Sequence, residues 1–174
     1  NPLKTHEGLR REVDLCVTCH TAGIVDPDTG NSVDFRAMIH KIHSGHALPS
    51  VEAGSPYQLI GDEGTEDYST VAFPQPLQNC VTCHTGADAS VWKDRPGALG
   101  CASCHDDVSF VEPAPPGMIA HAGGPQSNDD DCSVCHTAAP SGLESITSNH
   151  WTQFTAPAGT KLEAQIISVE NTGP

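Results

Sequence analysis

The sequence predicts a fold of mostly irregular loops and a few short α-helices, with little β structure except one C-terminal strand, packed around something other than aliphatic side chains. Leu, Ile, Val and Phe together account for only 33 of the 174 residues, and the formal net charge is −14. With 16 Gly and 14 Pro, this composition is otherwise typical of a disordered chain. The chain nevertheless has 8 Cys and 10 His, and their arrangement indicates what fills the interior.

All eight cysteines fall in four copies of the pattern Cys-x-x-Cys-His. The paired thiols are Cys16 and Cys19, Cys80 and Cys83, Cys101 and Cys104, and Cys132 and Cys135, followed by His20, His84, His105 and His136. This pattern is the attachment signature of c-type haem: two thiols form thioethers with the vinyl groups on one porphyrin edge, and the next imidazole reaches the iron. We therefore predict a multihaem cytochrome c with four covalent haem c groups as its core.

Zinc sites and disulfide scaffolds also use Cys-x-x-Cys pairs, but neither needs a histidine in the next position. From the histidine content, chance would place His after one pair about 6% of the time, and after all four roughly once in 10⁵. A thioredoxin-like redox motif would occur once rather than four times. Haem attachment is therefore favoured over these alternatives. Because it requires reduced thiols outside the cytoplasm, the protein is expected to be exported, to the periplasm or the outer surface.

A short helix is predicted over residues 35–44, between the first two motifs. Asp34 is suited to cap its N-terminus and Gly45 to end it. His40 and His43 then lie at positions i and i+3 on one face of the helix. One helix can thus present imidazoles to two different haems and set the distance between them.

Six histidines lie outside the motifs, enough for every haem to have a second axial imidazole. Five are predicted iron ligands: His6, His40, His43, His121 and His150. His46 follows the helix stop and is the weakest candidate. Met38 and Met118 are expected to pack rather than to ligate iron.

The remaining segments are interpreted from their residue composition. The acidic, Gly-rich stretch Gly61–Asp67 is predicted to be a solvated loop, and Glu112–Gly117 an extended, Pro-rich linker. Asn128–Asp131, directly before the last motif, is expected to be ordinary acidic surface. From about Thr155 the character changes, so residues 1–154 are assigned to the multihaem domain. Residues 155–174 are assigned to a linker and a strand, Lys161–Val169, that begins a following β domain.

The composition argues against nucleic acid as a partner and against a membrane-spanning segment. With 8 Lys and Arg against 22 Asp and Glu, the chain would repel the phosphates of a nucleic acid. No apolar run approaches the roughly 18 residues of a membrane span. The predicted chain is therefore neither a nucleic-acid binder nor a membrane-spanning segment.

Several segments of the sequence carry more information than the four motifs alone. They are Cys16–Thr21, the helix Asp34–His43, Phe73-Pro74 ahead of Asn79-Cys80, Cys101–Asp106 and the tail Ile167–Pro174. With them the chain resembles, over residues 1–174, the outer-membrane decahaem c-type cytochromes of metal-reducing bacteria (the OmcA/MtrC type). The double-histidine helix between the first two motifs is the most specific part of this resemblance.

The resemblance implies one pentahaem-like domain lacking its first haem motif, in a protein that also has β-barrel-like domains. Asn1–His6 looks like the segment just after such a motif, so five distal histidines would serve five haems, one of them outside this chain. A native tetrahaem protein is the alternative. Family members lie at the cell surface and pass electrons to ferric minerals, soluble metals or flavins. The implied partners are other multihaem cytochromes or a further haem domain of the same protein.

The predicted function is electron transfer through closely packed bis-His haems, not enzymatic catalysis. An iron with two axial imidazoles has no open position for a substrate. The alternatives are a multihaem reductase with one five-coordinate catalytic haem, and a haem-stapled structural or filament-forming subunit. The sequence has no cluster of Lys and Arg to bind an anionic substrate, which disfavours the reductase.

Overall fold

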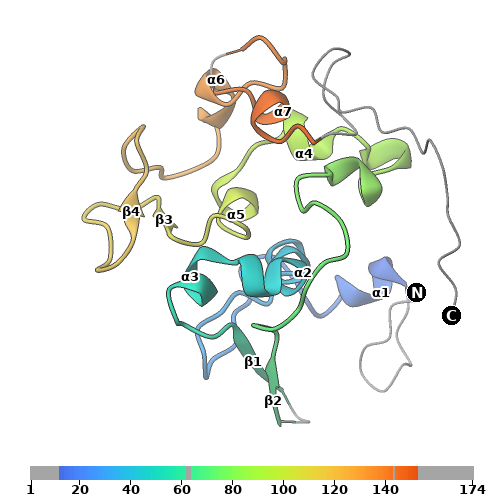
Figure 1. Ribbon diagram of the computed structural model, residues 1–174, viewed down its shortest axis with the longest axis vertical. Coiled ribbons are helices and arrows are strands. Elements are labelled where there is room, and N and C mark those ends of the chain that lie inside the picture. The colour runs from blue at the N-terminus through green and yellow to red at the C-terminus, as the bar shows by residue number, and fades with distance from the viewer. Residues whose placement is uncertain (1–11, 62–63, 143, 153–174) are drawn as a thin grey trace, which may run out of the picture.

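The computed structural model describes residues 12–61, 64–142 and 144–152. In this part of the chain, short helices are joined by long loops (Figure 1). The α-helices are α1 (Val13–Cys16), α2 (Phe35–Ser44), α3 (Pro49–Glu52), α4 (Val91–Asp94), α5 (Ala98–Cys101), α6 (Cys132–Cys135) and α7 (Ile146–Asn149). The 3-10 turns are η2 (Gly45–Ala47), η3 (Cys80–Thr82) and η4 (Gly86–Asp88). The predicted pattern of loops and a few short helices is thus confirmed.

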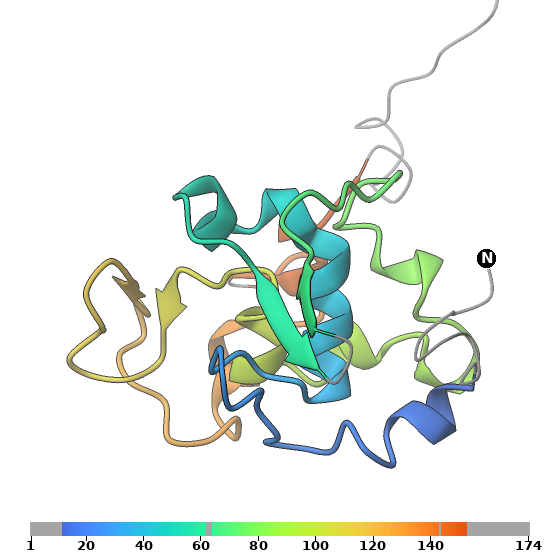
Figure 2. The same ribbon diagram turned by 90° about the horizontal axis from the view of Figure 1, so that it is seen from below.

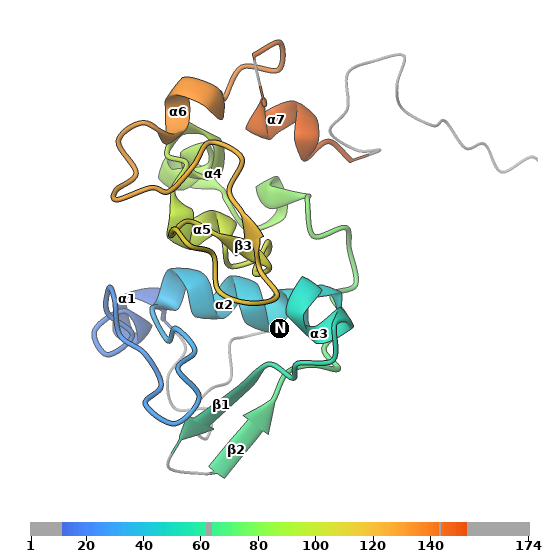
Figure 3. The same ribbon diagram turned by 90° about the vertical axis from the view of Figure 1, so that its left-hand side faces the viewer.

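Helix α2 occupies the middle of the molecule. Figure 3 shows it crossing between a β-hairpin on one side and helices α4 and α5 on the other. The carboxylate of Asp34 accepts the backbone N–H of Arg36 at 3.1 Å, and Gly45 ends the helix with φ of +44°. A Cβ at Gly45 would overlap the carbonyl oxygen and Cβ of Val71. Both predicted ends of this helix are therefore confirmed, and Gly45 is needed for its conformation and for a close approach.

Two small sheets complete the described structure. Strands β1 (Gln58–Gly61) and β2 (Gly64–Asp67) form an antiparallel hairpin, and β3 (Val108–Ser109) pairs in parallel with β4 (Ile119–Ala120). In Figure 2 the loop with β3 and β4 (yellow) and helix α1 (blue) project on opposite sides of the chain.

The hairpin corrects the prediction of a loop over Gly61–Asp67. All of β2 is exposed, so its sequence lacks the apolar alternation that marks a strand. The hairpin is anchored instead by a polar contact, because the buried carboxylate of Asp26 accepts the backbone N–H of Ile60 at 2.8 Å. The predicted strand Lys161–Val169 and the segment 155–174 lie outside the described residues.

The described residues have very few buried apolar side chains, namely Ala37, Leu48 and Tyr57. Many larger apolar side chains are exposed instead: Val13, Leu15, Val17, Ile24, Val25, Ile60, Leu77, Val81, Val111, Ile119 and Val134. No described helix is long and apolar enough to cross a membrane. Apolar burial of this extent does not make a conventional core, which agrees with the composition.

Candidate haem-binding sites

Each Cys-x-x-Cys-His motif forms one helical turn. In all four, the backbone N–H of the histidine donates to the carbonyl oxygen of the first cysteine, four residues earlier, at 2.8–3.0 Å. Residues four apart lie on the same face of a helical turn. The turn therefore brings the histidine close to the first thiol, as attachment of one porphyrin requires.

Three of the four motif histidines face a second histidine from elsewhere in the chain. The pairs and their ring-centroid separations are His84 with His40 (6.1 Å), His105 with His150 (6.2 Å) and His136 with His121 (6.0 Å). The rings of the first pair are nearly parallel, with an interplanar angle of 15°. These are three of the pairings that bis-imidazole ligation needs.

The separations fit a metal ion between the rings. Two metal–imidazole bonds of about 2.0 Å, with about 1.2 Å from each nitrogen to its ring centre, separate two ring centres by about 6.4 Å. The observed separations of 6.0–6.2 Å are close to this value. The residues present therefore suit a six-coordinate haem iron.

The imidazoles predicted to be distal ligands are oriented by one ring nitrogen, Nδ1. In His150 and His43, Nδ1 lies 2.7 and 2.8 Å from the carbonyl oxygen four residues earlier, and in His121 it lies 3.0 Å from the carbonyl oxygen of Gly124. His40 makes the same contact with Arg36. Donation from Nδ1 leaves Nε2 unprotonated, which is the form that binds a metal. Burial also lowers the pKa of His40 and so favours its neutral form.

In the described residues the thiols are not arranged as in a disulfide scaffold or a zinc site. All eight cysteines are free rather than joined as disulfides. The described residues contain no group of three or more His, Cys, Asp or Glu side chains placed to hold a metal, whereas a structural zinc site needs four such ligands. Burial raises the pKa of the Cys80, Cys101 and Cys132 thiols. These thiols are therefore protonated near neutral pH.

The other predicted ligands are placed differently. His20 has Nδ1 2.9 Å from the carbonyl oxygen of Val33, close to the start of α2. His43 meets the ring of Phe73 edge-on at 5.2 Å, and no motif histidine of the described residues stands opposite it. His46 is exposed, with Nδ1 2.9 Å from the carbonyl oxygen of Val71. His6 lies outside the described residues.

The structure also contains features that the sequence reasoning missed. One is an ion pair between Lys41 and Asp106 at 2.7 Å. Another lies in Asn128–Asp131, which is exposed as expected of acidic surface: Asp129 accepts the backbone N–H of Ala98, at the start of α5, at 2.9 Å. The only sequence signal for either is an acidic residue next to a motif, which is too common to be specific.

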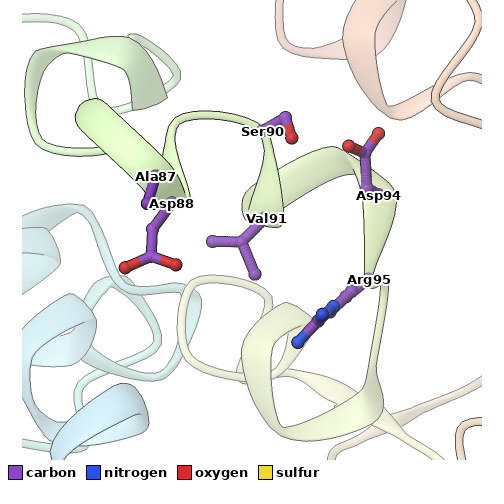
Figure 4. Close-up of a pocket in the computed structure, with 6 residues that line it drawn as sticks. All are labelled: Ala87, Asp88, Ser90, Val91, Asp94 and Arg95. Carbon is purple, nitrogen blue, oxygen red and sulfur yellow. The ribbon is translucent and has the colours of Figure 1, made fainter.

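A pocket of about 260 Å³ lies between η4 and α4 (Figure 4). It is lined by Ala87, Asp88, Ser90, Val91, Asp94 and Arg95. None of the predicted haem ligands lines it. Its lining mixes two carboxylates with one guanidinium, and no buried polar group among the six singles out a ligand class.

Comparison with known proteins shows what the chain is similar to. Residues 1–151 match the family described as outer membrane cytochrome MtrC/MtrF-like, domains II/IV. The multiheme cytochrome MtrC of Shewanella baltica (strain OS185) is 28% identical over 137 residues, covering 76% of this chain and 15% of that protein. The crystal structure of the outer membrane decaheme cytochrome OmcA superposes with a TM-score of 0.58 at 30% identity, over 81% of this chain and 20% of that chain. The chain thus spans a fifth or less of these relatives.

Proposed function

Because the chain belongs to the family of MtrC/MtrF-like outer membrane cytochromes, as their domain II or IV, we propose that it is an electron-transfer module with four bis-His haem c sites. The observation that carries this proposal is the set of three facing histidine pairs, at separations that suit an intervening iron. Haem c, when bound, supplies reversible one-electron chemistry. The chain's own residues would attach it, orient it and fill both axial positions.

Two of the proposed sites draw their imidazoles from distant parts of the sequence. His150, at the end of α7, stands opposite His105 of the third motif, and His40 of α2 stands opposite His84 of the second. Side chains held in this way from separate elements move little when an electron arrives, because each imidazole is fixed at Nδ1 or by its motif turn. The geometry is therefore suited to rapid exchange of electrons and not to the binding of a substrate.

The remaining ligands belong to the proposal as well. His20 would hold the haem of the first site, and His6, which lies outside the described residues, stays among the predicted distal ligands. His43 presents Nε2 away from its own helix, because Nδ1 is held by Ile39. We assign it to a haem carried by a Cys-x-x-Cys-His outside this chain. The whole protein would then carry further haem domains, as the family resemblance implies.

The family also supports a proposal for location and partners. We place the protein at the outer-membrane surface, exported, where it would exchange electrons with other multihaem cytochromes or with a further haem domain of its own chain. Ferric minerals, soluble metals or flavins would be its final acceptors. A dedicated catalytic site is not proposed.

The test is the intact mass of the haem-matured chain together with its ferric spectrum. We expect four haems per chain and a wholly low-spin spectrum that gives a sharp α band on reduction with dithionite. A colourless or zinc-containing product would overturn the proposal. A substantial high-spin fraction that binds cyanide without prior reduction would favour the reductase with a five-coordinate haem instead.

A further inference from the structure

The strongest unassigned feature is a buried charge pair between two haem sites. The chain carries a net charge of −14, yet the Lys41 side chain is only 15% exposed and its Nζ lies 2.7 Å from a carboxylate oxygen of Asp106, itself 5% exposed. By contrast, Arg36 and Lys93 are 68% and 33% exposed in their own ion pairs. The Lys41–Asp106 pair is therefore the most deeply placed ion pair of the described residues.

The pair is held in one geometry by its neighbours. Ser50, on α3, donates its backbone N–H to one oxygen of Asp106 at 2.9 Å and its hydroxyl to the other at 2.6 Å. The ring of Tyr57 lies 5.2 Å from Nζ of Lys41. Although burial tends to raise the pKa of Asp106, the hydrogen bonds from Lys41 and Ser50 outweigh it and lower that pKa. The Asp106 carboxylate therefore has Lys41 and Ser50 as fixed partners.

This pair docks the distal-histidine helix on the third motif. Ala37, Lys41 and Ser44 recur at i, i+4 and i+7, and so share one face of α2. Ala37 and Ser44 are buried, and the hydroxyl of Ser44 lies 3.4 Å from the thiol of Cys104. Lys41 directly follows His40 along the helix. The face that carries Lys41 is thus fixed to the third motif, while the adjacent face carries His40.

The position of Asp106 completes the connection. It directly follows His105, which faces His150. The ion pair therefore joins Lys41, next to the imidazole of His40 in one site, to Asp106, next to the imidazole of His105 in another. The bridge joins the second and third of the four proposed haem sites.

We propose that Lys41 and Asp106 are positioning residues that fix the second haem site against the third and balance each other's charge between the two sites. The inference rests on the proposed electron-transfer function. In the step concerned, one electron leaves one site and enters the next, and no bond or proton changes. The balance depends on both partners, because a buried charge without its partner acts strongly on its surroundings.

The test compares the redox midpoint potentials of the haem-matured Lys41→Met and Asp106→Asn proteins. Lys41→Met leaves an uncompensated carboxylate, which disfavours an added electron, so at least one midpoint shifts to a lower potential. Asp106→Asn leaves an uncompensated ammonium, so at least one midpoint shifts to a higher potential. We expect each shift to change the distribution of the electron at least tenfold, which corresponds to about 59 mV for one electron. The double variant should return towards the wild-type values.

Matched controls separate charge from structure. Lys93→Met removes a lysine from an exposed pair, with Nζ 3.3 Å from Asp94, and should leave the midpoints unchanged. Lys41→Arg keeps the charge and should retain the wild-type values, and it also provides a folded reference where Lys41→Met fails to bind haem. A purely structural role would move both single variants in the same direction.

The outcomes distinguish this inference from the function on which it rests. Shifts of the same sign in the two single variants, or midpoints unchanged in both, would overturn the balancing role while leaving electron transfer intact. A shift in Lys41→Arg as large as that in Lys41→Met would overturn it as well. A wild-type chain without redox-active haem would instead overturn the proposed function.

Discussion

At the scale of single residues, His40 and His46 make the same kind of local hydrogen bond but have different surroundings. Each has Nδ1 close to a backbone carbonyl oxygen. His40 faces His84 at 6.1 Å, whereas His46 is exposed and faces no motif histidine of the described residues. The two residues differ in whether a motif histidine faces the ring. They therefore provide a matched test of ligation.

We predict that His40→Ala, but not His46→Ala, changes the spin state of one haem. Loss of one axial imidazole leaves that iron five-coordinate, so about one quarter of the ferric haem should become high-spin. Electron paramagnetic resonance of the oxidised, haem-matured proteins measures this fraction. An entirely low-spin spectrum for His40→Ala, at full haem content, would contradict the assignment of His40.

The sequence was informative about residue types but not about their partners. Four repeats of a five-residue pattern predicted the thiols and motif histidines, and the number of spare histidines predicted a second imidazole for each iron. The structure places His40, His121 and His150 opposite three motif histidines, while ligation itself stays a prediction. Which histidine faces which could not be predicted, because loops bring them together from distances that no local pattern encodes.

At the scale of elements, the predictable parts are those with local physical signals. Helix α2 has a capping aspartate, a stop glycine and an apolar side, and its bounds were predicted from these. The β1–β2 hairpin lacks such a signal, since β2 is wholly exposed and its anchor, Asp26, lies more than 30 residues earlier in the sequence. Contacts of this kind, made by one buried carboxylate between distant segments, leave no periodic trace in the sequence.

A second contact between distant segments, made by the exposed carboxylate of Asp129, gives a prediction at this scale. Asp129 caps the start of α5, and a Cβ built at Gly97 would lie 2.5 Å from its Oδ2 atom. Gly97→Ala should therefore displace Asp129 and destabilise the docking of the fourth motif on the third by about 1 kcal/mol, the typical value of a lost helix cap. Denaturant unfolding of the haem-matured protein, followed by circular dichroism in the haem absorption band, measures the change.

Gly100 provides the control on the same helix. A Cβ there has no neighbour within 4 Å, and alanine is favoured over glycine in a helix by up to about 1 kcal/mol. Gly100→Ala should therefore match or exceed the wild-type stability. Equal stability of the Gly97→Ala and Gly100→Ala proteins would show that Asp129 does not hold these motifs together.

At the scale of the whole molecule, the described residues bury few apolar side chains while leaving many large ones exposed. Ordering a chain costs about 1–2 kcal/mol of backbone entropy per residue, which so small an apolar core does not offset. Composition alone predicted this deficit, and the repeated motifs predicted what fills it. The arrangement of the four sites in space was beyond the sequence, since it depends on contacts such as Lys41–Asp106 that join separate elements.

We predict that the protein does not fold without its covalent cofactor. Replacing all eight motif cysteines by alanine removes the attachment points and leaves the exposed apolar side chains without a surface to cover them. Far-ultraviolet circular dichroism should then show an unfolded chain, while the wild-type protein matured in parallel retains its helical signal. Intact secondary structure in the alanine variant would mean that the polypeptide carries its own core.

The pairing of the histidines also predicts the order in which the proposed sites would be completed during export from the N-terminus. The second site has both imidazoles once residue 84 has emerged, and the fourth has both by residue 136. The third has its thiols and His105 early but must wait for His150, beyond the fourth motif. We therefore expect it to be the last of the three to close, and its closure would hold α7 against the third motif.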